Sequence, residues 1–205
     1  MNRKNFIATS LFTAVSLSTF GRIVKNDNGT FTGDCETTND ILGPFYRANA
    51  PMRSDLMMKG LVGNKITIQG RILKSDCTTP IPNALVEIWH CDTQGNYDND
   101  SNKFLHRAAW KTNAQGDYSF VTILPGKYLN GDLYRPAHIH YRVSALNHKE
   151  LISQLYFKGD PYIEKDPWAS QEKAIHRILP ILPTEITGEL TVLFDVVLGD
   201  STIKK

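Results

Sequence analysis

A His-Ile-His triplet at the start of an alternating segment constrains this chain more than any other feature. Residues 135–141 read Arg-Pro-Ala-His-Ile-His-Tyr, so a proline precedes a run in which polar and apolar residues alternate. Alternation with a period of two is typical of a β-strand and places His138 and His140 on the same face. Their Cβ atoms then lie roughly 6.6 Å apart, which lets both imidazoles reach one metal ion. The alternative interpretation is that both histidines are polar side chains on a solvent-facing strand.

Short strands separated by turns account for most of the chain. The predicted strands are Lys65–Leu73, Ala84–Trp89, Asp117–Ile123, His138–Val143, Leu151–Phe157 and Glu189–Leu198. The polar residues 98–111 predict a long loop, and Asp166-Pro167-Trp168 predicts the start of a short helix with Asp166 as its N-cap. This order of elements predicts an all-β protein, an antiparallel β-sandwich with long loops and one or two short helices.

A single domain fits the length and charge of the chain. The 205 residues allow one domain, predicted at residues 41–205, preceded by a polar N-terminal arm at residues 22–40. The formal net charge of +2 gives no basic surplus of the kind that indicates a nucleic-acid partner or an anionic membrane.

Residues 1–21 resemble a secretory signal peptide. Arg3 and Lys4 form a short basic start, and the segment from Phe6 to Phe20 is apolar, rich in Ser and Thr and free of acidic residues. This segment is shorter than the about 20 apolar residues that a transmembrane helix needs. We therefore predict an exported protein, periplasmic or extracellular, with no integral membrane span after processing. The alternative is an apolar N-terminal helix that stays on a cytoplasmic protein.

The three cysteines, Cys35, Cys77 and Cys91, predict one disulfide and one free thiol if the protein is exported. The sequence leaves open which two of them pair. The absence of a Cys-x-x-Cys spacing gives no support for a thiolate metal site.

Two tyrosines that follow turns are candidate metal ligands. Tyr97 follows Gly95-Asn96, and Tyr128 follows Pro125-Gly126-Lys127. A phenol loses its proton only near about pH 10, so it binds divalent ions poorly, whereas a hard trivalent ion such as Fe(III) favours the anionic oxygen. The alternative is that both tyrosines only pack within a β-sandwich. The remaining histidines, which have no recognisable ligand spacing, are His90, His106, His148 and His176.

Five blocks of sequence occur in the order found in one enzyme family. They are residues 82–97, 116–120 (Gly-Asp-Tyr-Ser-Phe), 125–128 (Pro-Gly-Lys-Tyr), 135–140 (Arg-Pro-Ala-His-Ile-His) and 152–160. Together they resemble the intradiol ring-cleavage dioxygenases, most closely the protocatechuate 3,4-dioxygenase branch and more distantly catechol 1,2-dioxygenase. The resemblance runs from about Gly43 to the final strand, and the block 135–140 is its most distinctive part.

The resemblance implies a metal centre and the roles of its ligands. It implies one non-haem Fe(III) per chain, bound by Tyr97, Tyr128, His138 and His140 together with a water or hydroxide. By the same resemblance Tyr97 and His138 are equatorial ligands, and Tyr128 and His140 are axial. Tyr128 is further implied to leave the metal and act as a base.

The resemblance also implies a substrate and the residues around it. The substrates are a small aromatic diol of the protocatechuate type and O2, and the ring opens between its two hydroxylated carbons to a cis,cis-muconate-type diacid. Arg135 matches the active-site arginine of the family, Gln154 a glutamine near the substrate, and Tyr46 a pocket-wall position. Where the protocatechuate enzymes carry an aromatic residue after the second tyrosine, this chain has Leu129-Asn130. Those enzymes also pair two related chains, so a homo-oligomer is possible here.

Two other functions are open from the sequence. One is a non-catalytic β-sandwich binding module that keeps the frame of the family, and the other is a divalent-metal hydrolase built on the His-x-His pair. For Arg135 we expect a role in catalysis more than in folding, with a melting temperature that barely changes in Arg135→Leu. The alternative for Arg135 is a surface salt bridge with an acid such as Asp132.

Overall fold

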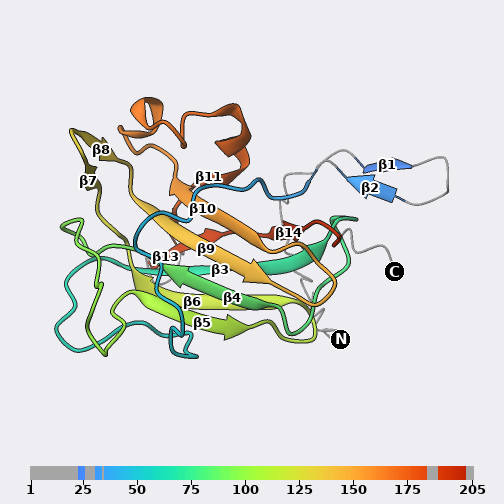
Figure 1. Cartoon of the computed structure of the whole chain (residues 1–205), viewed down its shortest axis with the longest axis horizontal. Helices are drawn as coiled ribbons and strands as arrows, with labels where there is room; N and C mark the ends of the chain where they lie inside the picture. Colours follow the sequence, from blue (N-terminus) through green and yellow to red (C-terminus); the bar gives the residue numbers. More distant parts are fainter. Residues whose placement is uncertain (1–22, 26–30, 34, 184–188, 202–205) are drawn as a thin grey trace, which may run out of the picture.

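Two β-sheets face each other across an apolar core (Figure 1). In this computed structural model, which describes residues 23–25, 31–33, 35–183 and 189–201, the first sheet has the strand order β11-β10-β9-β4-β5. Its strands are β4 (Leu85–Trp89), β5 (Arg107–Lys111), β9 (His138–Ser144), β10 (Leu151–Phe157) and β11 (Ile178–Leu179). The second sheet has the order β12-β13-β3-β14, and β6 pairs with β3. Its strands are β3 (Lys65–Lys74), β6 (Asp117–Ile123), β12 (Leu182–Pro183), β13 (Leu190–Leu193) and β14 (Val196–Leu198).

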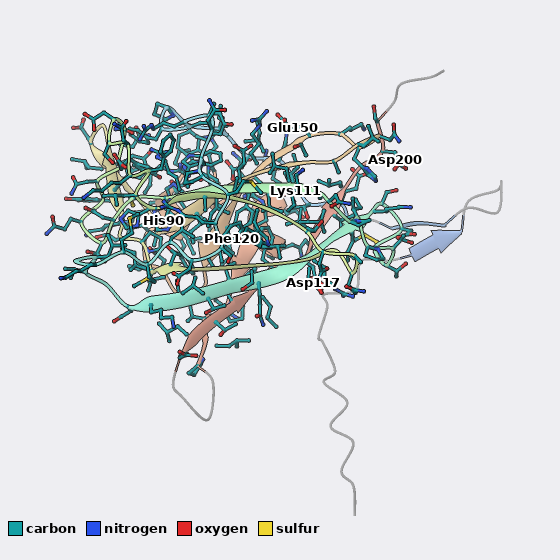
Figure 2. All side chains as sticks on the ribbon, turned by 90° about the horizontal axis from the view of Figure 1, so that it is seen from below. His90, Lys111, Asp117, Phe120, Glu150 and Asp200 are labelled. Carbon is teal, nitrogen blue, oxygen red and sulfur yellow. A yellow bond between two sulfur atoms is a disulfide. The ribbon has the colours of Figure 1, made fainter. Side chains whose placement is uncertain are left out.

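The core lies between these sheets because one side of each strand is apolar. Ile66 and Ile68 of β3 meet Val86 and Ile88 of β4 in one cluster, and all four are buried. Figure 2 shows Phe120 of β6 in the interior, where none of its surface is exposed. The predicted all-β sandwich is confirmed by this arrangement.

Strand direction is less uniform than we expected. Most neighbours are antiparallel, but β13 and β14 both run parallel to β3, and β11 runs parallel to β10. The predicted single strand at 189–198 is divided into β13 and β14. The two strands are separated at Phe194 and Asp195. There the Arg71 N–H donates to the Asp195 carboxylate at 2.8 Å instead of to a backbone carbonyl. The neighbouring Gly70 lies so close that an added Cβ would overlap the Phe194 carbonyl.

Two local predictions were wrong in detail. Part of the predicted loop at 98–111 forms β5, because Arg107–Lys111 pairs with the neighbouring strand β4. The helix predicted to begin at Asp166 is instead a turn, preceded by the 3₁₀ helix η1 (Ile163–Lys165) and followed by η2 (Glu172–Arg177). Asp166 nevertheless caps that turn, since its Oδ1 accepts the backbone N–H groups of Trp168 and Ala169.

Two small hairpins lie outside the sheets. β1 (Ile23–Lys25) pairs with β2 (Phe31–Gly33) and stands apart from the sandwich, while β7 (Tyr128–Asn130) pairs with β8 (Leu133–Arg135) at the opposite end (Figure 1). The strands β1 and β2 lie within the predicted polar arm. The predicted signal peptide at residues 1–21 lies outside the described residues. No helix in the described part of the chain has the length and apolar character needed to cross a membrane.

A disulfide anchors the segment that leads into the domain. Cys35 is bonded to Cys77 in the turn after β3, and Cys91 is a buried free thiol. The structure therefore chooses one of the three pairings that the sequence left open. After Cys35 the chain runs along the sandwich, where Thr37 bonds to Val197 of β14 and Asp40 donates its N–H to the Ile152 carbonyl at 2.8 Å.

Candidate metal centre

The predicted histidines lie on the face of the first sheet that points away from the core. In β9, Ile139, Tyr141 and Val143 belong to the core cluster, so the alternation places His138 and His140 on the opposite face. Both histidines are nevertheless almost fully buried, at 1% exposure each. They are therefore not polar side chains on a solvent-facing strand, because loops cover this face of the sheet.

Four aromatic rings gather over this face. The Tyr97 hydroxyl lies 3.3 Å from His138 Nε2, and the centroids of the two histidine rings are 4.9 Å apart. The Tyr128 ring lies 5.7 Å from that of His138 and 5.6 Å from that of Tyr97, and the Tyr97 ring is 6.2 Å from that of His140. The structure thus brings together all four residues predicted as ligands, although they come from three separate segments of the chain.

A tight turn fixes the two tyrosines relative to each other. The Asp92 carboxylate accepts the backbone N–H groups of Gln94 and Asn96, both at 2.8 Å, and so closes the turn before Tyr97. Gly95 in this turn has φ +89°, and a Cβ at this position would lie 3.1 Å from Tyr128 Cα. Glycine is therefore required on both counts where the two tyrosine-bearing segments pack together.

The histidines present unprotonated ring nitrogens. His138 Nδ1 lies 2.6 Å from the Pro136 carbonyl oxygen, which can only accept, so Nδ1 carries the proton and Nε2 keeps its lone pair. Burial, followed by the charge of Arg135, lowers the pKa of His138 to about 4. Burial and the neighbouring charges of His138 and Arg135 hold the pKa of His140 well below its ordinary value. Both rings are consequently neutral at pH 7, which is the form that binds metals.

The remaining donors fit a hard, highly charged ion. Burial, followed by the neighbouring Cys91 and Tyr128, raises the pKa of Tyr97 well above its ordinary value, so its phenol keeps its proton at neutral pH unless a cation replaces it. His140 Nδ1 is buried without a hydrogen-bond partner. Two imidazoles and two phenols form a donor set suited to Fe(III). In the described part of the chain, no three or more His, Cys, Asp or Glu side chains gather to hold a metal ion.

Aromatic neighbours support the rings from two sides. Trp89 is the cross-strand partner of His140, and their rings stack with centroids 4.8 Å apart and planes 6° from parallel. From the N-terminal segment, Phe45 stacks on Tyr97 at 4.2 Å, and Gly43 lies so close to His140 that an added Cβ would be 3.1 Å from its Cε1.

Tyr46, predicted as a pocket wall, makes other contacts. Its hydroxyl donates to Glu87 Oε1 at 3.0 Å and accepts from Arg142 Nη1 at 2.6 Å. Its ring meets the edge of Trp89 with centroids 5.1 Å apart. Phe45, which the sequence did not single out, is the aromatic residue of this segment that stacks on a predicted ligand, Tyr97.

Arg135 is buried in an ion pair, which changes the expected balance between catalysis and folding. Its side chain and that of Asp166 are both 0% exposed, and Nε lies 2.7 Å from Asp166 Oδ2. The alternative of a surface salt bridge with Asp132 is therefore wrong. The melting temperature of Arg135→Leu is also expected to fall, because a buried carboxylate would lose its partner. The Nη1 group of Arg135 is buried without a partner.

Gln154, predicted near the substrate, has both ends of its amide engaged by protein groups. Its Oε1 accepts from Arg135 Nη2 and from the Tyr156 hydroxyl, both at 3.1 Å. Its Nε2 donates to the Ile41 carbonyl at 2.9 Å. Gln154 thus contacts Arg135 directly. It also lies beside the histidines on the neighbouring strand, because Gln154 of β10 is the register partner of His140 of β9.

Four residues of this site were missed from the sequence: Trp89, Phe45, Tyr156 and Asp166. Trp89 ends a predicted strand, but its place beside His140 depends on the pairing of β4 with β9, which the sequence does not show. Asp166 was recognised only as a helix cap, since nothing in its local sequence indicates a partner 31 residues earlier.

Similar proteins are dioxygenases. A protein-family model described as "Dioxygenase" matches residues 41–199. The chain is 30% identical over 183 residues to a chlorocatechol 1,2-dioxygenase of Rhodococcus opacus, a match that covers 78% of this chain and 70% of that protein. It is 31% identical over 187 residues to the protocatechuate 3,4-dioxygenase beta chain of Burkholderia cepacia, covering 80% and 79%.

A solved structure shares the fold over nearly its whole length. It is the dioxygenase domain of a dioxygenase carbohydrate-binding protein fusion from the cellulolytic bacterium Streptomyces sp. SirexAA-E, with a TM-score of 0.70 and 27% identity, covering 81% of this chain and 99% of that one. Several catechol 1,2-dioxygenases are longer, so that the matched segment covers between 49% and 54% of their length.

Proposed function

The chain belongs to the intradiol ring-cleavage dioxygenase family, and from this premise we propose that it is a non-haem Fe(III) enzyme that inserts both atoms of O2 into a catechol. The ring would open between the two hydroxylated carbons to give a cis,cis-muconate-type diacid. The observation that carries this proposal is the convergence of Tyr97, Tyr128, His138 and His140 in one cluster. Tyr128 and both histidines are buried, and Tyr97 is partly buried.

Bound by these four residues, a ferric ion would supply the Lewis acidity and the electron-withdrawing character that make a catechol reactive toward dioxygen. The protein itself supplies proton transfer and charge stabilisation. In the proposal Tyr128 would bind the ion as a phenolate, and this phenolate Oη is the base that takes a proton from a catechol hydroxyl. Tyr128 borders both His138 and Arg135. Arg135 stabilises the negative charge that builds up on the ring oxygens, since its Nη1 is an unpaired donor in a buried site.

We propose a protocatechuate-like diol, supported by the similarity to a protocatechuate 3,4-dioxygenase chain. The β7–β8 hairpin that carries Tyr128 and Arg135 exposes Leu129 and Leu133, at 55% and 39%. Unsubstituted catechol and protocatechuate are therefore the two substrates to compare first.

The test is oxygen consumption by iron-loaded protein. With catechol or protocatechuate we expect uptake of one O2 per ring and a ring-opened product with two new carboxyl groups, together with a visible absorption band from phenolate bound to Fe(III). Protein kept free of iron is the control and should consume no oxygen. Binding of catechol to the iron-loaded protein without oxygen uptake would favour the non-catalytic binding module instead.

We also propose that the protein is exported and that residues 1–21 are its signal. The disulfide between Cys35 and Cys77 supports this proposal, because such bonds persist mainly in oxidising compartments. Mass spectrometry of the protein from its native host decides the question. An intact Met1 on a protein recovered from the cytoplasm would contradict export.

A further inference from the structure

Asp166 is not among the residues assigned to the proposed reaction, yet it makes the shortest contact to Arg135, at 2.7 Å. We infer that Asp166 is a positioning residue, which holds the Arg135 guanidinium in one orientation and leaves Nη1 as its free donor. The inference rests on the proposed function, because it assigns Asp166 a part in the same site.

The contacts of the guanidinium divide it into a held side and a free side. Nε donates to Asp166 Oδ2 at 2.7 Å, and Nη2 donates to Asp166 Oδ1 at 3.3 Å, so the carboxylate accepts from two guanidinium nitrogens in a bidentate ion pair. Nη2 also donates to Gln154 and Tyr156, both at 3.1 Å. Nη1 is buried and has no partner. The two N–H groups on Nη1 are thus the donors that remain for a bound ligand.

The orientation of the guanidinium plane is fixed as well. Its Cζ lies 4.4 Å from the centroid of the Trp168 ring and 6.0 Å from that of Tyr128. Arg135 and Tyr128 are also register partners across the β7–β8 hairpin, so the backbone ties the arginine to a predicted ligand. The arginine therefore lies next to the metal centre and cannot rotate freely.

Asp166 is itself held independently of the arginine. Its Oδ1 accepts the backbone N–H of Trp168 at 3.0 Å and that of Ala169 at 2.7 Å, and its backbone carbonyl accepts the N–H of Ser170 at 3.1 Å. The same carboxylate thus closes the turn that places Trp168 over the guanidinium. Loss of its charge is expected to release the arginine while leaving the turn itself intact.

Asp166→Asn separates these two functions. The asparagine oxygen can still accept the two backbone N–H groups, but its amide hydrogens would face the Nε–H of Arg135, and two donors cannot bond to each other. We expect turnover to fall by about 10²-fold, the usual effect of misplacing a reacting group by about 1 Å. Iron content and the visible band should stay near those of the native protein.

The chain offers a control in a second ion pair, between Glu87 and Arg142. Glu87 Oε2 lies 3.1 Å from Arg142 Nη1, and the Glu87 side chain is 9% exposed. The other Glu87 oxygen accepts from the Tyr46 hydroxyl, so Glu87→Gln removes a carboxylate charge outside the contacts that hold Arg135. We expect this variant to lose some thermal stability and to keep most of its turnover.

A double-mutant cycle tests whether Asp166 acts through Arg135. In an Arg135→Leu background, Asp166→Asn should change turnover by no more than about twofold, because the group that it positions is already gone. Full additivity of the two effects would overturn the inference and assign Asp166 a general structural role. Native turnover in the single Asp166→Asn variant would overturn it too. Should that variant fail to fold, Asp166→Glu replaces it and is expected to show an intermediate loss.

A measurement on metal-free protein keeps this inference separate from the proposed function. Hydrogen exchange of the Arg135 Nε–H, followed by ¹⁵N NMR, should be slow in the native protein and at least about tenfold faster in Asp166→Asn, in proportion to the loss of a buried charged hydrogen bond. Equal exchange rates would contradict positioning by Asp166. If the native iron-loaded protein consumes no oxygen with any catechol, the proposed function fails, while the exchange rates still decide whether Asp166 holds the guanidinium.

Discussion

Phe45 lies flat against Tyr97, with ring centroids 4.2 Å apart and planes inclined by only 16°. The N-terminal segment therefore completes the candidate metal centre from outside the two sheets. Phe45→Ala should destabilise the protein by at least about 0.5–1.5 kcal/mol, the value of a stacked aromatic pair beyond its buried area. It should also shift the visible band of the iron-loaded protein, because Tyr97 would lose its support. Thermal unfolding and one spectrum check both effects, and an unchanged spectrum would contradict the support of Tyr97 by Phe45.

Tyr97→Phe removes one predicted phenolate and keeps the ring. We expect the visible charge-transfer absorption of the iron-loaded protein to weaken and move, while the stacking on Phe45 preserves the fold. The measurement is a visible spectrum at equal iron content. A native-like band in this variant, or a colourless native protein that is fully loaded with iron, would rule out Tyr97 as a ligand.

Gly43→Ala should displace the His140 ring. Gly43 has φ +71°, and an added Cβ would lie 3.1 Å from His140 Cε1. Gly131→Ala is the matched control, because Gly131 has φ +63° with nothing within 4 Å of the added Cβ. Both variants should lose about 1–2 kcal/mol from the left-handed backbone alone. Only Gly43→Ala should also lower the iron content per chain, and equal iron contents would show that His140 is not displaced.

Arg135→Leu should impair both turnover and stability. Without the arginine the Asp166 carboxylate is left buried and unpaired, which typically costs about 3–5 kcal/mol. Turnover should fall by a factor of roughly 10²–10³, since a preorganised donor is lost from the site. Combining Arg135→Leu with Asp166→Asn should recover part of the melting temperature but none of the turnover. Near-native oxygen consumption by the single variant would refute the role of Arg135.

Loss of the disulfide should loosen the segment that leads to Phe45. Cys35 and Cys77 are separated by 42 residues, and a loop of this size predicts a stabilisation of about 4 kcal/mol. Replacing both cysteines by serine should lower the melting temperature accordingly. A reducing agent should destabilise the native protein but leave the double variant unchanged. If the reducing agent has no effect on the native protein, the disulfide contributes little to its stability.

The alternation of polar and apolar residues was enough to predict most of the long strands and the face that carries the histidines. His138 and His140 are two positions apart in one strand, so local geometry alone places them together. The same reasoning found the sandwich, because the apolar side of each strand must be buried against another element. The pattern could not show that β5 closes the sheet edge inside a polar segment, since pairing with β4 decides this.

The relations between distant segments depended on the tertiary structure. Only the fold brings Tyr97 and Tyr128 over the histidine face, places Phe45 rather than Tyr46 against Tyr97, and pairs Arg135 with an acid 31 residues away. The sequence around an aspartate does not show whether its carboxylate caps a turn or neutralises a buried arginine. The chain topology determines its partner, and the residues next to it in sequence do not. The sequence by itself therefore determined most of the long strands and the candidate ligands, and the packing of loops on the outer face of the sheet decided what surrounds those ligands.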